Sequence, residues 1–156
     1  MVNTTLLDEA AVARALDTVV DPEIPVVTIA DLGIIRSVDI DGDSINVTIT
    51  PTYSGCPAMR QIEDDIVSAL RKAGAVSVEV ETVYLPAWST DWITEEGRRK
   101  LNEFGIAPPV AEADVVCPRC STGSPRMVAR FGSTACKALM VCSACGEPFD
   151  YFKELH

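Results

Sequence analysis

The sequence contains very little histidine, and this scarcity limits the chemistry that the chain can perform. The one histidine is His156, at the last position. A carboxylate di-iron site needs Glu-x-x-His motifs on two helices, so an oxygenase centre of that kind is excluded. Glycine-rich nucleotide loops of the G-x-G-x-x-G or Walker type are also absent from the sequence. The chain is therefore a poor candidate for an oxygenase, a reductase or an ATPase.

Long apolar runs are missing too. No stretch approaches the ~18 apolar residues that cross a membrane. The first residues, 1–5, have neither the basic start nor the apolar stretch of a secretory signal. We therefore expect a cytoplasmic protein without a membrane partner, in which cysteines stay reduced.

Basic residues are few and unevenly placed. The chain has 13 Lys/Arg against 23 Asp/Glu, a net charge of −10. Residues 1–113 carry 8 Lys/Arg against 19 Asp/Glu, or −11, whereas residues 114–156 carry 5 against 4, or +1. Nucleic-acid binding usually needs a basic face, so we expect protein partners and no nucleic acid.

Two C-x-x-C pairs, Cys117/Cys120 and Cys142/Cys145, are the most informative motifs that are present. Each pair places two thiolates on one tight turn, and the 21 residues between the pairs suit a β-hairpin that folds them onto one tetrahedral ion. Pro118 and Gly146 suit such turns. The spacing predicts a metal site made of four thiolates.

Residues 114–156 are then expected to form a β-rich zinc ribbon. A closed site of four thiolates is typical of structural zinc, and a core this small does not fold unaided. A single iron ion, as in a rubredoxin-like site, uses the same four ligands, so the spacing leaves zinc and iron open. Cys136 lies outside both pairs among small and apolar residues, which favours a buried strand position, with a working thiol as the alternative.

The residue pattern of the N-terminal part predicts an α-β-β-α-β unit. With the β-rich ribbon that follows, the expected fold class is α+β. Thr5, with Asp8 three residues on, is a candidate cap for a first helix that ends before Pro22. Asp41-Gly42 separates an apolar run from a clean alternation, which predicts a hairpin. Along its second strand, Ile45, Val47 and Ile49 are expected to face one way, and Ser44, Asn46, Thr48 and Thr50 the other.

A second helix and a third strand complete this unit. Apolar residues recur with helical spacing from Met59 to Ala73 and end at Gly74. Val76, Val78 and Val80 then alternate along a strand. We expect a right-handed crossover, with its strands parallel or nearly adjacent.

Residues 1–107 are assigned to this first domain, of which 84–107 form a linker segment. Trp88 and Trp92 begin that segment, either as an interaction surface or as a lid over a small core, and we favour the lid. A short helix follows from Thr94 to Phe104 and ends at Gly105.

The loop before the second helix is the expected place for chemistry. Pro57 suits the first helical position, which puts Cys56 at the N-cap, where the helix dipole lowers a thiol pKa. A reactive or metal-binding thiol is one hypothesis, and a small buried residue at a tight turn is the other. Asp21-Pro22-Glu23 is, on composition alone, a turn that ends the first helix.

Several motifs together resemble a known family. Asp21-Pro22-Glu23-Ile24-Pro25, Asp31-Leu32-Gly33-Ile34-Ile35, Gly55-Cys56-Pro57 and Pro86-Ala87-Trp88 are similar, in order and spacing, to motifs of the metal–sulfur cluster assembly family that includes the SufT proteins. Further stretches, Phe131–Leu139 and Glu147–Lys153 among them, resemble the family of small accessory proteins of the bacterial phenylacetyl-CoA epoxidase system.

The resemblance implies a role in aerobic phenylacetate degradation, as an accessory or maturation factor without catalytic activity of its own. It implies that Cys56 holds iron or an iron–sulfur cluster in transit, with Asp21 and Glu23 beside it. The expected partners are the epoxidase subunits, with self-association also possible. The alternative is a structural or rubredoxin-like electron-transfer subunit of the same complex.

Overall fold

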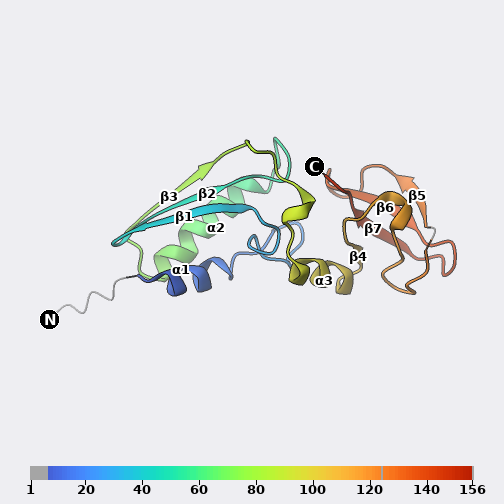
Figure 1. Cartoon of the computed structure of the whole chain (residues 1–156), viewed down its shortest axis with the longest axis horizontal. Coiled ribbons are helices and arrows are strands. Elements are labelled where there is room, and N and C mark those ends of the chain that lie inside the picture. Colours follow the sequence, from blue (N-terminus) through green and yellow to red (C-terminus); the bar gives the residue numbers. More distant parts are fainter. Residues whose placement is uncertain (1–6, 124, 156) are drawn as a thin grey trace. The chain divides into compact units, whose positions relative to one another are not determined.

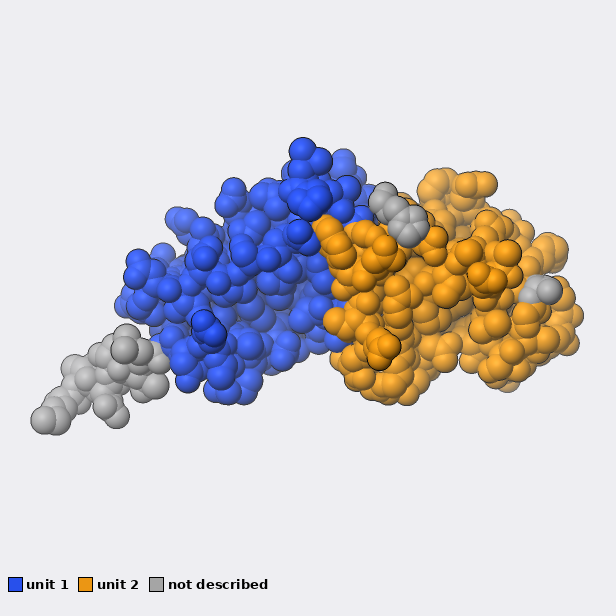
Figure 2. All heavy atoms as spheres, in the orientation of Figure 1, with its two compact units in different colours: residues 1–88 blue, residues 89–156 orange. Residues whose placement is uncertain are grey.

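The structure, a computed structural model, describes residues 7–123 and 125–155. It divides the chain into two compact units, Met1–Trp88 and Ser89–His156, which Figure 2 shows in different colours. Residues 84–107, expected to belong to the first domain, are thus divided between the two units. Within the second unit, a strand of two residues, β4 (Ile106–Ala107), pairs with β7 (Pro148–Phe152) near the end of the chain.

The first unit has the predicted α-β-β-α-β order. Its elements are α1 (Glu9–Leu16), β1 (Ile35–Asp41), β2 (Ser44–Ile49), α2 (Met59–Lys72) and β3 (Ser77–Thr82). The sheet order is β1-β2-β3, with β1 antiparallel to β2 and β2 parallel to β3. Both helices cover one face of the sheet (Figure 1). The expected adjacent, parallel pairing across the second crossover is confirmed.

Local signals explain where α1 begins. The Asp8 carboxylate accepts a hydrogen bond from the Ala11 N–H at 2.7 Å, so Asp8 is the N-cap. Thr5, the predicted cap, lies outside the described residues. Val12 and Leu16, one turn apart, are buried, which anchors the helix to the core.

The predicted hairpin is confirmed, with its two-residue turn at Gly42 and Asp43, between the paired residues Asp41 and Ser44. One residue of its second strand differs from the expectation. Ile45, Val47 and Ile49 of β2 are at most 2% exposed. Thr50 was expected on the same face as Ser44, Asn46 and Thr48 of β2, but it follows the last residue of the strand and is 1% exposed. Its N–H donates to the Ile34 carbonyl at 2.9 Å.

Trp88 closes the first unit. Its side chain is 3% exposed, and its indole N–H donates to the Leu32 carbonyl at 2.8 Å. The lid interpretation is therefore confirmed for Trp88, whereas Trp92 in the second unit is half-buried.

The second unit is β-rich, as predicted. After the 3-10 turn η1 (Thr90–Trp92) come α3 (Glu95–Glu103), β4, the 3-10 turn η2 (Glu112–Asp114), β5 (Arg126–Ala129), β6 (Lys137–Val141) and β7. The sheet order is β4-β7-β6-β5. Its core contains Ala107, Val115, Cys117, Ala138, Met140, Cys142, Phe149 and Tyr151.

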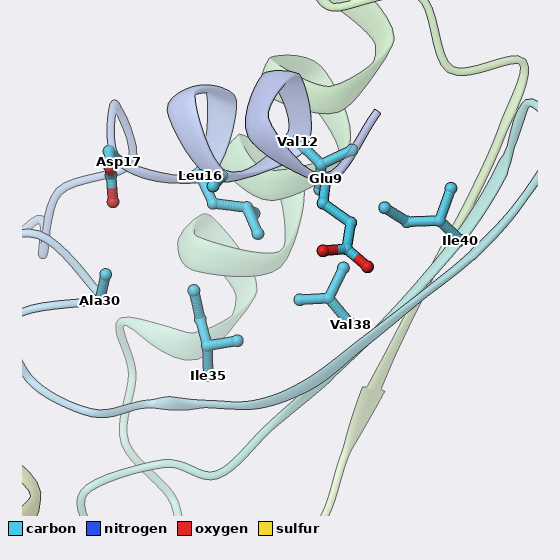
Figure 3. A pocket seen from close by; sticks show the side chains of 9 residues that line it. Glu9, Val12, Leu16, Asp17, Ala30, Ile35, Val38 and Ile40 are labelled. Carbon is cyan, nitrogen blue, oxygen red and sulfur yellow. The ribbon is translucent and has the colours of Figure 1, made fainter. Parts of the chain in front are cut away.

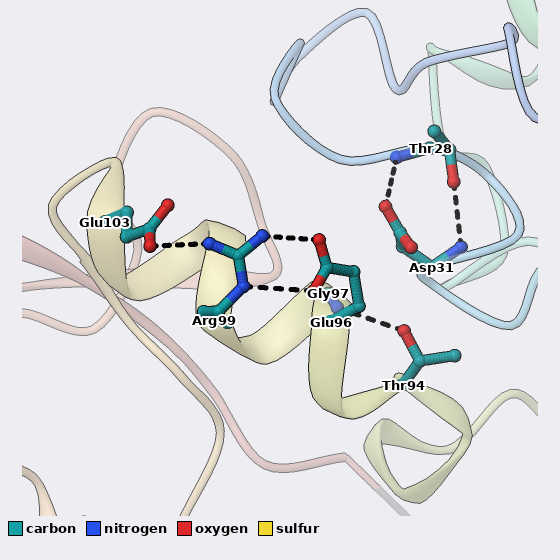
Figure 4. Close-up of polar contacts among 7 residues, drawn as sticks. All are labelled: Thr28, Asp31, Thr94, Glu96, Gly97, Arg99 and Glu103. Atoms are coloured by element: carbon teal, nitrogen blue, oxygen red, sulfur yellow. Dashed lines mark hydrogen bonds and ion pairs between the residues drawn. The ribbon is translucent and has the colours of Figure 1, made fainter.

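The helix predicted from Thr94 to Phe104 is present as α3. Thr94 caps it by accepting the Gly97 N–H at 3.0 Å, and Arg99 bridges Glu96 and Glu103 on the exposed face (Figure 4). The helix ends where Gly105 adopts a positive φ of 91°.

A reciprocal pair of hydrogen bonds joins the two ends of the second unit. The Thr90 N–H donates to the Leu155 carbonyl at 2.9 Å, and the Leu155 N–H donates to Thr90 Oγ1 at 3.2 Å. Arg98 adds bonds to the carbonyls of Thr90 and Pro109. The start of this unit is therefore fixed to its last described residue.

Among the described residues, no helix is both long and apolar enough to span a membrane.

Candidate metal centre and the Cys56 loop

The structure brings the four paired cysteines together. The ligand atoms of Cys117, Cys120, Cys142 and Cys145 all lie within 4.8 Å of one another. Two sulfur–sulfur distances are 3.8 Å, from Cys117 to Cys145, and 3.5 Å, from Cys120 to Cys142. In a tetrahedral site with metal–sulfur bonds of ~2.3 Å, sulfurs lie ~3.8 Å apart, so the arrangement fits one tetrahedral ion.

Each pair lies on a turn with the same backbone pattern. The Ser121 N–H donates to the Cys117 carbonyl at 2.8 Å, and the Gly146 N–H donates to the Cys142 carbonyl at 2.9 Å. Both donors have positive φ, 61° at Ser121 and 77° at Gly146. The two halves of the site are thus equivalent, except that one turn uses a serine where glycine has no steric penalty.

The second residue after each pair extends the pattern. The N–H groups of Cys117 and Cys142 donate to the carbonyls of Thr122 and Glu147. Thr122 Oγ1 also lies 2.9 Å from Cys120 Sγ. Thr122 was not predicted as a site residue, although its place relative to the first pair matches that of Glu147 relative to the second.

These contacts change the acidity of the exposed thiols before any metal binds. Hydrogen bonds from the Thr122 hydroxyl and backbone lower the pKa of Cys120 to about 6. The Glu147 backbone lowers the pKa of Cys145, but burial and the neighbouring thiols outweigh this and raise the pKa to about 11. Of these two exposed thiols, Cys120 is therefore the one that becomes a thiolate near neutral pH, whereas a binding cation must displace the proton of Cys145.

Cys56 lies on the loop between β2 and α2, but not at the predicted cap. The helix begins at Met59 with Ala58 as its N-cap, and the Met59 N–H donates to the Cys56 carbonyl in the preceding turn. Cys56 is half-buried. The N-cap prediction is therefore wrong.

The predicted direction of the Cys56 pKa shift is also wrong. Burial raises the pKa of the Cys56 thiol above its ordinary value, although a hydrogen bond from the Ala58 N–H opposes the shift. The negative charges of Glu23 and Asp21 raise it further, whereas a hydrogen bond from Tyr53 lowers it. The same contacts show that the structure brings Asp21 and Glu23 within electrostatic range of Cys56.

Asp21 has a structural role in its turn. Its carboxylate is 8% exposed and accepts the N–H groups of Glu23 at 2.7 Å and Ile24 at 3.0 Å. Asp31 makes a similar turn with Thr28, in which each side chain bonds the backbone N–H of the other (Figure 4). The turn interpretation of the acidic motif is therefore confirmed for Asp21. The hydrogen bond from the Glu23 N–H to Asp21 also fixes the backbone position of Glu23.

Cys136 is buried, as expected, directly before β6. Its thiol lies 3.0 Å from Thr134 Oγ1, and its carbonyl accepts the Lys153 N–H at 3.0 Å. It is not one of the four clustered cysteines.

Comparison with known families separates the same two parts of the chain. Residues 9–82 match the iron–sulfur cluster assembly protein family, and residues 107–153 match the PaaD zinc beta ribbon domain. In class, the molecule is an iron–sulfur assembly domain joined to a zinc ribbon domain.

Individual relatives narrow the assignment. A putative 1,2-phenylacetyl-CoA epoxidase subunit from Escherichia coli (strain K12) is 46% identical over 145 residues, which is 88% of each chain. The chain belongs to the family of this epoxidase subunit. An Fe-S protein maturation auxiliary factor from Porphyromonas gingivalis is 37% identical over 103 residues, 65% of this chain and 97% of that one.

A solved structure supports the fold of the first part. The crystal structure of a domain of unknown function, DUF59, from Bacillus anthracis aligns with a TM-score of 0.55 at 30% identity. The alignment covers 60% of this chain and 90% of the other.

Proposed function

We propose that this chain is a cytoplasmic accessory factor that helps to assemble an iron or iron–sulfur centre in a phenylacetyl-CoA epoxidase system. The family assignment supports a role beside the epoxidase, and the assembly domain supports a role in maturation. In this role Cys56 is the transfer ligand, and Asp21 and Glu23 hold the negative charge that attracts the incoming iron.

The observation that carries the proposal is that one soft ligand, the Cys56 thiol, lies within electrostatic range of two hard ligands, the carboxylates of Asp21 and Glu23. Iron accepts thiolate and carboxylate ligands. Because the pKa of Cys56 is raised, the empty site holds a neutral thiol, and arriving iron displaces its proton. A single protein thiolate on a half-exposed loop binds loosely enough to pass the iron on.

The four-cysteine site is the resident metal site in this proposal. Its donor set and sulfur spacing fit structural zinc, held by Cys117, Cys120, Cys142 and Cys145. The ion stabilises the second unit, which serves as the module that binds epoxidase subunits.

The test uses cells in which a Cys56→Ser chain is the sole source of this protein. Epoxidase purified from them should be iron-poor and largely inactive, while the variant remains soluble and keeps its zinc. The matched control is Cys136→Ser, which removes the other cysteine outside the metal site. Fully active, iron-replete epoxidase from the Cys56→Ser cells would exclude Cys56 as the transfer ligand.

A second function is favoured by the exposure of half the metal site. Cys120 and Cys145 are exposed, so an iron ion bound there could exchange electrons with a partner protein. The chain would then be a rubredoxin-like electron-transfer subunit of the epoxidase. Metal analysis of aerobically purified protein separates the two, because a four-thiolate iron site is strongly coloured and a zinc site is colourless.

A further inference from the structure

A groove lies between α1 and the free side of β1 in the first unit. Its volume is about 550 Å³. Figure 3 shows side chains of α1 and β1 facing one another across it. The apolar walls are Val12, Leu16, Ile35, Val38 and Ile40. The groove contains none of Asp21, Glu23 and Cys56, so it is a separate feature from the proposed transfer site.

The groove lies beside an edge strand. Among the described strands, β1 has one neighbour in its sheet, β2. The two strands are joined by a two-residue turn, with Asp41 opposite Ser44. Such a turn closes on a hydrogen-bonded pair, and these pairs alternate along an antiparallel ladder. The backbone N–H and carbonyl groups of Val38 and Ile40 therefore point away from β2, along the edge where a further strand could pair.

The charges around this edge are mostly negative, and Arg36, near the start of β1, is the one basic residue of that strand. Glu9 and Asp17 line the groove, and none of the described residues that line it is a Lys or an Arg. Figure 3 shows the Glu9 carboxylate projecting from α1 toward Val38 and Ile40. On the other face of β1, Asp39 and Asp41 are exposed. A segment paired with β1 would thus meet carboxylates on both faces and apolar side chains on one.

We propose that the β1 edge and its groove bind an extended segment of a partner protein in which apolar and basic residues alternate. The segment adds a fourth strand to the sheet through the outward backbone groups of Val38 and Ile40. Its apolar side chains enter the groove, and its basic side chains lie on the opposite face, next to Asp39 and Asp41. This proposal does not depend on Cys56 or on iron transfer.

Charge also argues against a second copy of this chain as the occupant. Two β1 strands paired antiparallel would bring Asp39 and Asp41 of each copy close to the other copy's acidic edge, with Glu9 and Asp17 adding to the repulsion. An irregular register between Ile35 and Ser37 disturbs one end of the edge further. A basic partner gains from the same charges that keep two copies apart.

The probe is a seven-residue peptide that alternates lysine and valine, with blocked ends, added to the full metal-loaded chain. A peptide of the same composition, with its lysines and valines in separate blocks, is the matched control. We expect the alternating peptide to bind at least five-fold more tightly by fluorescence anisotropy. Amide chemical shifts should move most at Val38 and Ile40 and least along β3.

Charge reversal then locates the site. The double variant Asp39→Lys/Asp41→Lys should weaken binding of the alternating peptide at least ten-fold. The control, Glu79→Lys/Glu81→Lys, makes the same charge change at exposed positions of β3, the other edge strand, and should change binding less than two-fold. Circular dichroism checks that both variants are folded.

Three results would overturn the proposal. The first is equal affinity for the two peptides, and the second is equal weakening by the two double variants, since each indicates unspecific attraction to an acidic surface. The third is a dimer in sedimentation equilibrium whose interface maps to β1, because the occupant would then be a second copy.

Discussion

At the scale of single residues, the chemistry of Cys56 depends first on its burial, and then on the opposing effects of the helix start and of two carboxylate neighbours. The thiol accepts the Ala58 N–H, as a residue at a helix start would, yet burial and the charges of Glu23 and Asp21 raise its pKa. Burial, together with the acidic neighbours, thus protects the empty site from alkylation and oxidation, because the thiolate is the reactive form.

This view predicts the pH dependence of Cys56 alkylation. In metal-loaded protein, the rate with iodoacetamide should rise with pH through a midpoint above that of an ordinary cysteine. Glu23→Gln removes a negative charge, stabilises the thiolate and should shift the midpoint to lower pH. Glu81→Gln, an exposed carboxylate on β3, is the control and should leave the midpoint in place. An unchanged midpoint in Glu23→Gln would show that Glu23 does not act on the thiol.

The two metal-binding turns provide a second prediction at this scale. Ser121→Gly should relieve the positive φ of Ser121 and stabilise the metal-bound unit by about 0.5–1 kcal/mol, which is a gain of about two- to five-fold in apparent zinc affinity. Gly146→Ser, at the equivalent position, should destabilise the metal-bound unit and reduce its zinc affinity by similar amounts. Competition with a chromogenic chelator measures both. Equal affinities in all three proteins would mean that the backbone at these turns carries no such penalty.

At the scale of helices and strands, α3 depends on its first residues. Thr94 holds the Gly97 N–H, while Gly97 itself is a weak helix former. Thr94→Ala should therefore destabilise α3 by about 1 kcal/mol. Hydrogen exchange of the α3 amides is the measurement. Asn102→Ala, at an exposed position of the same helix, should not reduce protection. If Thr94→Ala left exchange unchanged, packing rather than the cap would hold the helix start.

The elements that the sequence predicted are those with local signals. Alternation at Ile45, Val47 and Ile49 predicted β2, and the cysteine pairs predicted the ribbon turns. By contrast, β4 has two residues, and it exists because Ile106 pairs with Asp150 far along the chain. No local sequence pattern predicts such a pairing between residues far apart in the chain.

The site was predictable in its residue types and not in its electrostatics. Two matched cysteine pairs identify a metal site by spacing alone, and the structure clusters them. The pKa of Cys56 depends on how deeply its loop is buried and on the charges of Glu23 and Asp21, which lie in a separate segment of the chain. The positive φ of Ser121 could not be predicted either, because a serine does not indicate a positive φ in the way that a glycine such as Gly146 does.

At the scale of the whole molecule, the two units should differ in their dependence on metal. The core of the second unit includes the metal ligands Cys117 and Cys142 together with Ala107 of β4. The first unit has its own core of fully buried residues, including Ile62, Ile66 and Leu70 of α2. Metal should therefore stabilise one unit and not the other.

Metal removal tests this division. A chelator, or Cys117→Ser, should remove hydrogen-exchange protection from β4 to β7 while β2 and α2 stay protected. The first unit itself is the internal control. Loss of protection in β2 and α2 as well would show that the chain unfolds as one cooperative body.

The bonds between Thr90 and Leu155 place the entrance and the exit of the second unit side by side. A unit of this kind tolerates circular permutation, because new termini can open elsewhere while the old ones are joined by a short linker. It can likewise be inserted into a surface loop of an unrelated host without stretching the host's chain. The second unit is therefore suited to transfer as a whole, and a host that carries it would test whether this unit binds epoxidase subunits without the assembly domain.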